Sequence, residues 1–190
     1  MAKLYSLCMP NTYFENEYLL SLRGMSSLKV HMVCLGNICR SPMAAAVLHN
    51  KSKKLTKPSI TVSSSGTGNW HVGQGANPNS KLVWENAGYK YEHSAKQFHP
   101  DNFEKLDLIL AMDLTNRANI LNLATTAEQK NKVFMLRSFD PKLSGIDATK
   151  PEGAKLQVPD PYGEGINSFE NVLDMVEQAC DGLINYFSAN

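Results

Sequence analysis

The chain has 190 residues, of which 43% are hydrophobic, and its formal net charge is +1. These values suit one globular domain with a sizeable core. They exclude a disordered chain, a strongly basic nucleic-acid binder and a charged membrane-surface protein. No stretch approaches the roughly 20 consecutive apolar residues of a membrane-spanning helix.

The cysteines and histidines of the chain follow no regular spacing. Its five histidines are scattered, so we expect neither a bound metal ion nor a cofactor. The cysteine spacing does not match a disulfide-stapled secreted domain, and a cytoplasmic setting that keeps thiols reduced is expected. The four cysteines are Cys8, Cys34, Cys39 and Cys180.

Residues 1–27 form an N-terminal extension in which apolar residues are interrupted by proline and charged residues. They lack the basic start and continuous apolar core of a signal peptide. We expect a loosely ordered extension or a mis-assigned start, with Met25 as the true first residue. The alternative is a short helix over Phe14–Arg23, docked on the domain or on a partner.

From residue 28 the chain alternates between strand-like and helix-like segments. Apolar residues predict a first strand at Leu28–Val33. A helix is expected from about Ser41 to Lys53, because serine is a good N-cap and Pro42 suits the first helical position.

The remainder of the chain continues this alternation. Near-continuous apolar runs indicate buried strands, and apolar residues at helical spacing indicate helices packed on a sheet. The expected elements are a strand at Ser59–Ser63 after Pro58, a loop at Ser64–Gly75, a helix from Asn77-Pro78 to Gly88, a short helix at Pro100–Lys105, a strand at Leu106–Met112, a helix at Leu114–Leu123, a strand at Lys132–Arg137, a loop at Asp140–Gly165 and a helix at Ile166–Phe187.

This order of elements predicts the fold class. Alternating strands and helices indicate a single three-layer α/β domain over residues 28–190, with a four-stranded parallel sheet flanked by helices. The loop after the first strand then lies at the carboxyl edge of the sheet, where such folds bind ligands.

That loop carries the chemistry, in the run Val33-Cys-Leu-Gly-Asn-Ile-Cys-Arg-Ser-Pro42. Backbone N–H groups and the helix dipole favour an anion at the start of the following helix. Five residues separate Cys34 from Arg40, which is enough to curl the backbone around a tetrahedral oxyanion. The sequence therefore predicts a phosphate-binding loop.

The two ends of the loop predict a reaction. A thiol near a guanidinium, a helix start and a hydroxyl is favoured as the nucleophilic thiolate. Arg40 can hold two phosphate oxygens bidentately, and the Ser41 hydroxyl can donate to the sulfur of Cys34. We interpret Cys34 as the nucleophile of a two-step phosphoryl transfer through a phosphocysteine.

The run resembles the active-site loop of the low-molecular-weight protein tyrosine phosphatases, particularly bacterial ones. The resemblance covers roughly Leu28–Asn190 and extends to His93 in His-Ser-Ala-Lys-Gln, Asp113 in Ala-Met-Asp-Leu-Thr-Asn, and Asp160-Pro161-Tyr162-Gly163. It implies a metal-independent enzyme that hydrolyses phosphotyrosine in proteins and is inhibited by phosphate-like oxyanions. The phosphate-binding residues it implies are Leu35, Gly36, Asn37, Ile38, Cys39, Arg40 and Ser41.

A phenolate leaving group needs a carboxylic acid to protonate it. The predicted loop after the fourth strand contains several candidates, and composition alone does not choose among them: Asp140, Asp147, Glu152, Asp160 and Glu164. The resemblance selects Asp160 as the catalytic acid, and Tyr162 beside it can form an aromatic wall for a phenyl ring. Asp140, also before a proline, is expected in a turn.

Further residues are expected to support or border the site. By resemblance, Trp70 lines the opposite side of the entrance and faces Tyr162; alternatively it caps the edge of the core. The resemblance implies that Ser64 and His93 brace Asn37, which tolerates a left-handed backbone. Asp113 could fix a loop backbone or bear on Arg40. Ordinary loop polarity is the alternative for each supporting residue.

The resemblance also implies a redox role for Cys39, which would trap oxidised Cys34 as a disulfide before further oxidation. The alternative is a small buried thiol.

Three rival functions remain. A protein-arginine phosphatase shares the fold, but Ile38 and Tyr162 favour phosphotyrosine by resemblance. An arsenate reductase needs two further cysteines on a flexible segment, and only Cys8 and Cys180 remain. A non-catalytic phosphate-binding or phosphocarrier domain would need no acid such as Asp160. Gly163 stands where a second aromatic residue often follows in animal members, so the shape of the pocket rim stays open.

Overall fold

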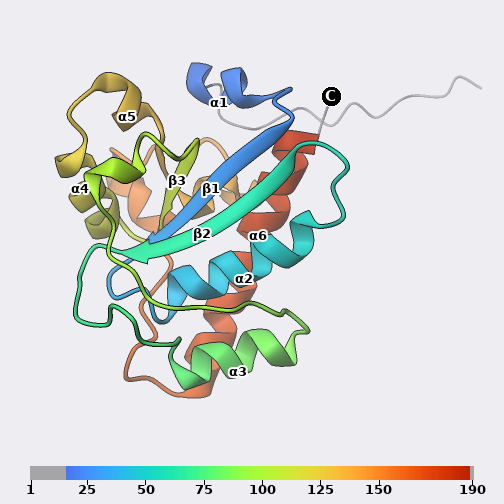
Figure 1. Ribbon diagram of the computed structural model, residues 1–190, viewed down its shortest axis with the longest axis vertical. Coiled ribbons are helices and arrows are strands. Elements are labelled where there is room, and N and C mark those ends of the chain that lie inside the picture. The colour runs from blue at the N-terminus through green and yellow to red at the C-terminus, as the bar shows by residue number, and fades with distance from the viewer. Residues whose placement is uncertain (1–15, 189–190) are drawn as a thin grey trace, which may run out of the picture.

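A four-stranded parallel sheet forms the centre of the molecule (Figure 1). A computed structural model describes residues 16–188. The strand order is β2-β1-β3-β4, and neighbouring strands are parallel throughout. The strands are β1 (Ser27–Cys34), β2 (Ser59–Gly66), β3 (Leu108–Ala111) and β4 (Val133–Met135).

Helices cover both faces of this sheet (Figure 1). One face carries α2 (Arg40–Ser52), α3 (Pro78–Asn86) and α6 (Ile166–Ser188). The other carries α4 (Leu114–Leu123), with α5 (Ala127–Asn131) beside β4. The three-layer α/β fold with a four-stranded parallel sheet is thereby confirmed.

The sheet separates two apolar cores. Val30 and Met32 of β1 pack toward α2 and α6, whereas Val33 and Ile109 pack toward Ile120 of α4. Successive side chains of a strand point to opposite faces, so a sheet buried on both faces needs apolar residues at nearly every position. This explains the continuous apolar runs.

Several boundaries differ from those expected. Helix α2 begins at Arg40 with Cys39 as N-cap, so the assignment of Ser41 as N-cap was wrong. Strand β2 continues past Ser63 to Gly66, which pairs with Cys34 at the end of β1. Pairing with the central strand thus extends β2 through serines, which favour strands only weakly.

The later segments are more broken than expected. Strand β3 is shorter than Leu106–Met112, and β4 ends at Met135 rather than at Arg137. Helix α5, capped by Thr126, was not expected. Short 3-10 helices occur at Pro100–Asn102, Leu136–Phe139, Pro141–Leu143 and Pro151–Leu156.

Helix α1 (Glu17–Leu22) lies before the first strand. Leu19 and Leu22 are buried in the larger core, and the Tyr18 hydroxyl donates to the Asp107 carbonyl at 2.6 Å. A loosely ordered extension therefore does not describe residues 16–27, where the structure has a helix that lies within the alternative range Phe14–Arg23 and is shorter than it. Residues 1–15 lie outside the described residues, and the domain boundary at residue 28 stays a prediction.

Within residues 16–188, no helix is both long enough and apolar enough to cross a lipid bilayer.

Candidate active site

The loop between β1 and α2 turns its carbonyl groups outward. Five carbonyl groups accept a hydrogen bond from a neighbouring segment: Cys34 from the Thr67 N–H, Leu35 from the Gly68 N–H, Asn37 from His93, Ile38 from the Asn77 N–H and Cys39 from the Ser80 hydroxyl. In a trans peptide unit the N–H points opposite to the C=O. The N–H groups of residues 35, 36, 38, 39 and 40 therefore point into the loop, as an oxyanion requires.

Asn37 holds the shape of the loop. It is fully buried and has a φ of 55°, the only positive φ of a residue other than glycine between residues 16 and 188. Its Nδ2 donates to the hydroxyls of Ser41 (2.9 Å) and Ser64 (3.0 Å), and its Oδ1 accepts from the Lys96 N–H (2.8 Å). These contacts stabilise a backbone conformation that is unfavourable for most side chains.

His93 adds a further bond, 2.7 Å from its Nε2 to the Asn37 carbonyl oxygen. Since a carbonyl oxygen can only accept, Nε2 must carry the proton. Burial, together with the charge of Lys96, lowers the pKa of His93, although its bond to Asn37 opposes this shift. The ring is therefore neutral near pH 7. The structure brings Ser64 and His93, the two residues predicted to brace Asn37, onto that residue.

Two donors converge on the sulfur of Cys34. The Ser41 hydroxyl lies 3.0 Å from Sγ and the Asn37 N–H lies 3.2 Å away. The Ser41 oxygen is also 3.3 Å from the Ser65 carbonyl, but a hydroxyl has only one hydrogen. Asn37 Nδ2 donates to the Ser41 oxygen, and the Ser41 hydrogen points at the sulfur, the nearer of its two acceptors, where it stabilises negative charge.

Arg40 lies at the opposite end of the loop, with only 3% of its side chain exposed. Nη1 donates to Asp113 Oδ2 at 2.6 Å and to the Val158 carbonyl at 3.1 Å, and Nη2 donates to Asp160 Oδ2 at 2.6 Å. Burial by itself would lower the pKa of Arg40, but Cys34 and the two carboxylates raise it overall. The guanidinium therefore remains charged.

One edge of the guanidinium is only partly used. The Nε–H of Arg40 is buried and has no acceptor among the described residues. Nε and Nη2 form the edge that binds two oxygens of a phosphate or carboxylate side by side. At present Asp160 occupies only the Nη2 position of that edge.

The acidic residues near the loop have separate roles. Asp113 bonds Arg40, as one of the two suggestions has it, and the backbone that it holds is the start of helix α4 rather than a loop, since it accepts from the Asn116 N–H at 2.6 Å. Asp160 Oδ1 accepts from the Tyr162 N–H at 3.3 Å. Asp140 is buried away from this loop, accepts from the Lys142 N–H and pairs with Arg137 at 3.6 Å. The expected turn at Asp140 is confirmed.

Aromatic side chains border the mouth of the site. A cavity of about 190 Å³ is lined by Cys34, Leu35, Gly36, Ile38, Cys39, Arg40, Trp70, His71, Asp160 and Tyr162. Trp70 is 64% exposed and Tyr162 is 61% exposed, so Trp70 is a rim residue rather than a cap on the core. Trp70 requires Gly68, where a Cβ would lie 1.3 Å from the indole ring.

Cys39 lines the same cavity and is itself buried. Burial above all, and then the charge of Cys34, raise the pKa of its thiol to about 12. Cys39 is therefore a neutral thiol near pH 7. It forms no disulfide with Cys34, which is also a free cysteine.

Several contributors to the site were not expected from the sequence. His71 lines the cavity with its ring 6.4 Å from that of Tyr162, and its position after Trp70 was the only signal. Lys96, Ser65 and Val158 act through backbone groups, for which side-chain identity gives no signal. In the part of the chain from residue 16 to 188, no three His, Cys, Asp or Glu side chains are arranged to hold a metal ion.

Comparison with known proteins agrees with this geometry. The family model described as low molecular weight phosphotyrosine protein phosphatase matches residues 29–190. A low molecular weight protein-tyrosine-phosphatase from Streptomyces coelicolor is 41% identical over 157 residues, covering 82% of this chain and 91% of that protein.

Solved structures of similar chains share the fold. A protein tyrosine phosphatase from Entamoeba histolytica has a TM-score of 0.71 and 33% identity, covering 83% of this chain and 94% of that one. The YwlE arginine phosphatase from Geobacillus stearothermophilus has a TM-score of 0.68 and 29% identity, covering 83% of this chain and 91% of that one. The chain therefore belongs to the low molecular weight phosphotyrosine protein phosphatase family.

Proposed function

We propose that the protein hydrolyses phosphotyrosine in other proteins through a phosphocysteine formed on Cys34. One observation carries the proposal: the sulfur of Cys34, the guanidinium of Arg40 and the carboxylate of Asp160 line one small cavity between Trp70 and Tyr162. A nucleophile, an oxyanion-binding group and an acid are the parts that phosphoryl transfer requires.

Phosphate binding begins at Arg40. Two oxygens of the phosphate bind the edge formed by Nε and Nη2, and the inward N–H groups of the loop bind the equatorial oxygens. The phosphate then takes the place of Asp160 on Nη2 and releases that carboxyl group toward the leaving oxygen. Charge in a loose transition state is spread over these same equatorial oxygens, so the loop stabilises it.

The reaction has two chemical steps. In the first, the S–P bond to Cys34 forms as the bond from phosphorus to the tyrosine oxygen breaks, and Asp160 gives its proton to that oxygen. In the second, Asp160 accepts a proton from water as the water oxygen attacks phosphorus. The thiolate of Cys34 leaves, stabilised by the donors from Ser41 and Asn37, and inorganic phosphate is released.

The mouth of the site supports an aryl substrate. Trp70 and Tyr162 are exposed aromatic rings on the rim, and the Ile38 side chain adds an apolar contact inside the cavity. A phenyl ring can pack between such rings at favourable offset or edge-to-face geometry. Phosphate-like oxyanions are expected to compete with substrate for the loop.

The substrate class can be tested directly, because arginine phosphatases share this fold. With EDTA present, kcat/KM for a phosphotyrosine peptide should exceed that for the same peptide carrying phosphoarginine by about 100-fold or more. Release of inorganic phosphate measures both. A preference for phosphoarginine would contradict the proposal.

We also propose that Cys39 protects the nucleophile, in a reducing compartment such as the cytoplasm. Peroxide oxidises the Cys34 thiolate to a sulfenic acid, and the Cys39 thiol condenses with it to give a disulfide and water. After a peroxide pulse, dithiothreitol should restore most of the activity of the wild type. The fraction of activity recovered by Cys39→Ser should be at least about fivefold smaller. Activity toward p-nitrophenyl phosphate before and after treatment is the measurement, and equal recovery in both proteins would refute the role.

A further inference from the structure

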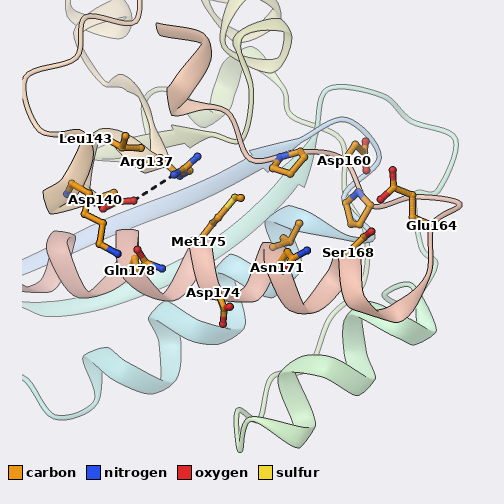
Figure 2. A pocket seen from close by; sticks show the side chains of 14 residues that line it. Arg137, Asp140, Leu143, Asp160, Glu164, Ser168, Asn171, Asp174, Met175 and Gln178 are labelled. Atoms are coloured by element: carbon orange, nitrogen blue, oxygen red, sulfur yellow. Dashed lines mark hydrogen bonds and ion pairs between the residues drawn. The ribbon is translucent and has the colours of Figure 1, made fainter. Parts of the chain in front are cut away.

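A second cavity adjoins the active site on the far side of Asp160. It has a volume of about 560 Å³ and lies between the loop of residues 159–164, the 3-10 helix Pro141–Leu143 and one side of α6. Figure 2 shows it running along α6 from the end near Asp160 and Glu164 to the end near Asp140 and Gln178. Asp160 lines both this groove and the catalytic cavity, so the two are neighbours that share this residue as a wall.

The helix side of the groove combines amides with apolar surface. Asn171 and Gln178 are exposed amides, and Met175 between them points into the space toward Arg137 (Figure 2). Pro159 and Pro161 form the wall nearest the active site. Amide side chains can both donate to and accept from a peptide backbone, and methionine packs against varied side chains.

The dimensions of the groove suit an extended peptide. Ser168 and Gln178 are ten positions apart on α6, which spans about 15 Å at roughly 1.5 Å per residue. An extended chain advances about 3.3 Å per residue, so four or five residues match this length. A volume within about 300–1,000 Å³ is typical of ligand-binding cavities.

Charge in the groove is not uniform. At the far end the Arg137 guanidinium pairs with Asp140. At the end next to the active site Glu164 is exposed, and no cation within residues 16–188 forms an ion pair with it. A basic residue close to the phosphotyrosine would therefore find a carboxylate there.

We propose that this groove, defined by Pro161, Glu164, Asn171, Met175 and Gln178, binds the segment of the substrate protein that flanks the phosphotyrosine. The proposal rests on the tyrosine phosphatase function above and adds a preference for a basic flanking residue. The position of the groove directly beside the catalytic cavity favours this occupant, since a polypeptide leaving the site past Asp160 meets the groove, with the exposed carboxylate of Glu164 at its near end.

Truncating the two amide side chains tests peptide binding in the groove without changing the residues that carry out the reaction. For the double variant Asn171→Ala with Gln178→Ala, kcat/KM for a nine-residue phosphotyrosine peptide should fall about tenfold, the effect of losing two ordinary hydrogen bonds. Hydrolysis of p-nitrophenyl phosphate, which has no flanking peptide, should change less than about twofold. Asn185→Ala is the matched control, because Asn185 is an exposed asparagine of α6 outside the groove.

Reversing the charge tests the specificity. The wild type should cleave a peptide with lysine beside the phosphotyrosine about threefold faster than one with glutamate, as expected for an exposed ion pair. Glu164→Lys should reverse that order. The groove proposal would be overturned if the double variant lost the same kcat/KM on the peptide and on p-nitrophenyl phosphate, or lost none on the peptide. It would also be overturned if Glu164→Lys kept the charge preference of the wild type. A folded wild type that is inactive on p-nitrophenyl phosphate would instead contradict the phosphatase function.

Discussion

Replacing Cys34 by serine is expected to lower kcat for p-nitrophenyl phosphate by about four orders of magnitude or more, because the nucleophile is lost. A serine hydroxyl can occupy the same position and accept the bonds from Ser41 and Asn37. It is not ionised near neutral pH, and no described side chain is placed to act as its base: Ser41 donates to this atom, and His93 is committed to the Asn37 carbonyl. Stopped assays of p-nitrophenol release, with EDTA present, measure the change.

Phosphate binding provides the control for this variant. Arg40 and the inward N–H groups are unchanged in Cys34→Ser, so inorganic phosphate should bind with at least the affinity of the wild type, as measured by calorimetry. Cys180→Ser is a matched substitution of a buried cysteine in α6, outside the site. It should retain activity. If instead the folded wild type bound phosphate but had no activity to lose, a phosphate-binding or phosphocarrier domain would explain the site better.

The parts of this site that could be predicted from sequence lie within one short segment. Cys34, Asn37, Arg40 and Ser41 follow one another between a strand and a helix, so the local geometry of that turn places them around one anion. Parallel strands and helices were likewise predictable, because the apolar pattern differs between a buried strand and a helix. The boundaries of the elements were less predictable, because pairing with β1 extends β2 from the predicted end at Ser63 to Gly66.

The parts that could not be predicted depend on contacts between distant segments. The Val158 carbonyl bonds Arg40 across 118 positions, and the Lys96 N–H bonds Asn37 across 59. Backbone groups are the same in every residue except proline, so no residue pattern marks them. The proposed acid was predicted only through the family resemblance: Asp140 and Asp160 both precede proline, and the fold shows that the first pairs with Arg137 and the second with Arg40.

The second large effect is expected for Asp160→Asn, which removes the proposed acid but preserves the shape of the side chain. For phenyl phosphate, whose leaving oxygen needs a proton, kcat should fall by about 10²–10⁴-fold. For p-nitrophenyl phosphate the leaving group is stable as an anion, and the loss should be at least about tenfold smaller. The ratio of the wild-type kcat to the Asp160→Asn kcat, followed across a series of substituted phenyl phosphates, therefore measures how much the acid contributes.

The same variant should bind inorganic phosphate more tightly than the wild type. The Asp160 carboxylate lies 2.6 Å from Nη2 of Arg40, on the edge of the guanidinium that phosphate must occupy. An amide competes for that position without a negative charge, so both the competition and the repulsion of phosphate decrease. Asp113→Asn is the comparison: its carboxylate bonds the other nitrogen, Nη1, so it should disturb Arg40 without the leaving-group dependence. An Asp160→Asn variant with slower turnover on all substrates alike and weaker phosphate binding would show that Asp160 only positions Arg40.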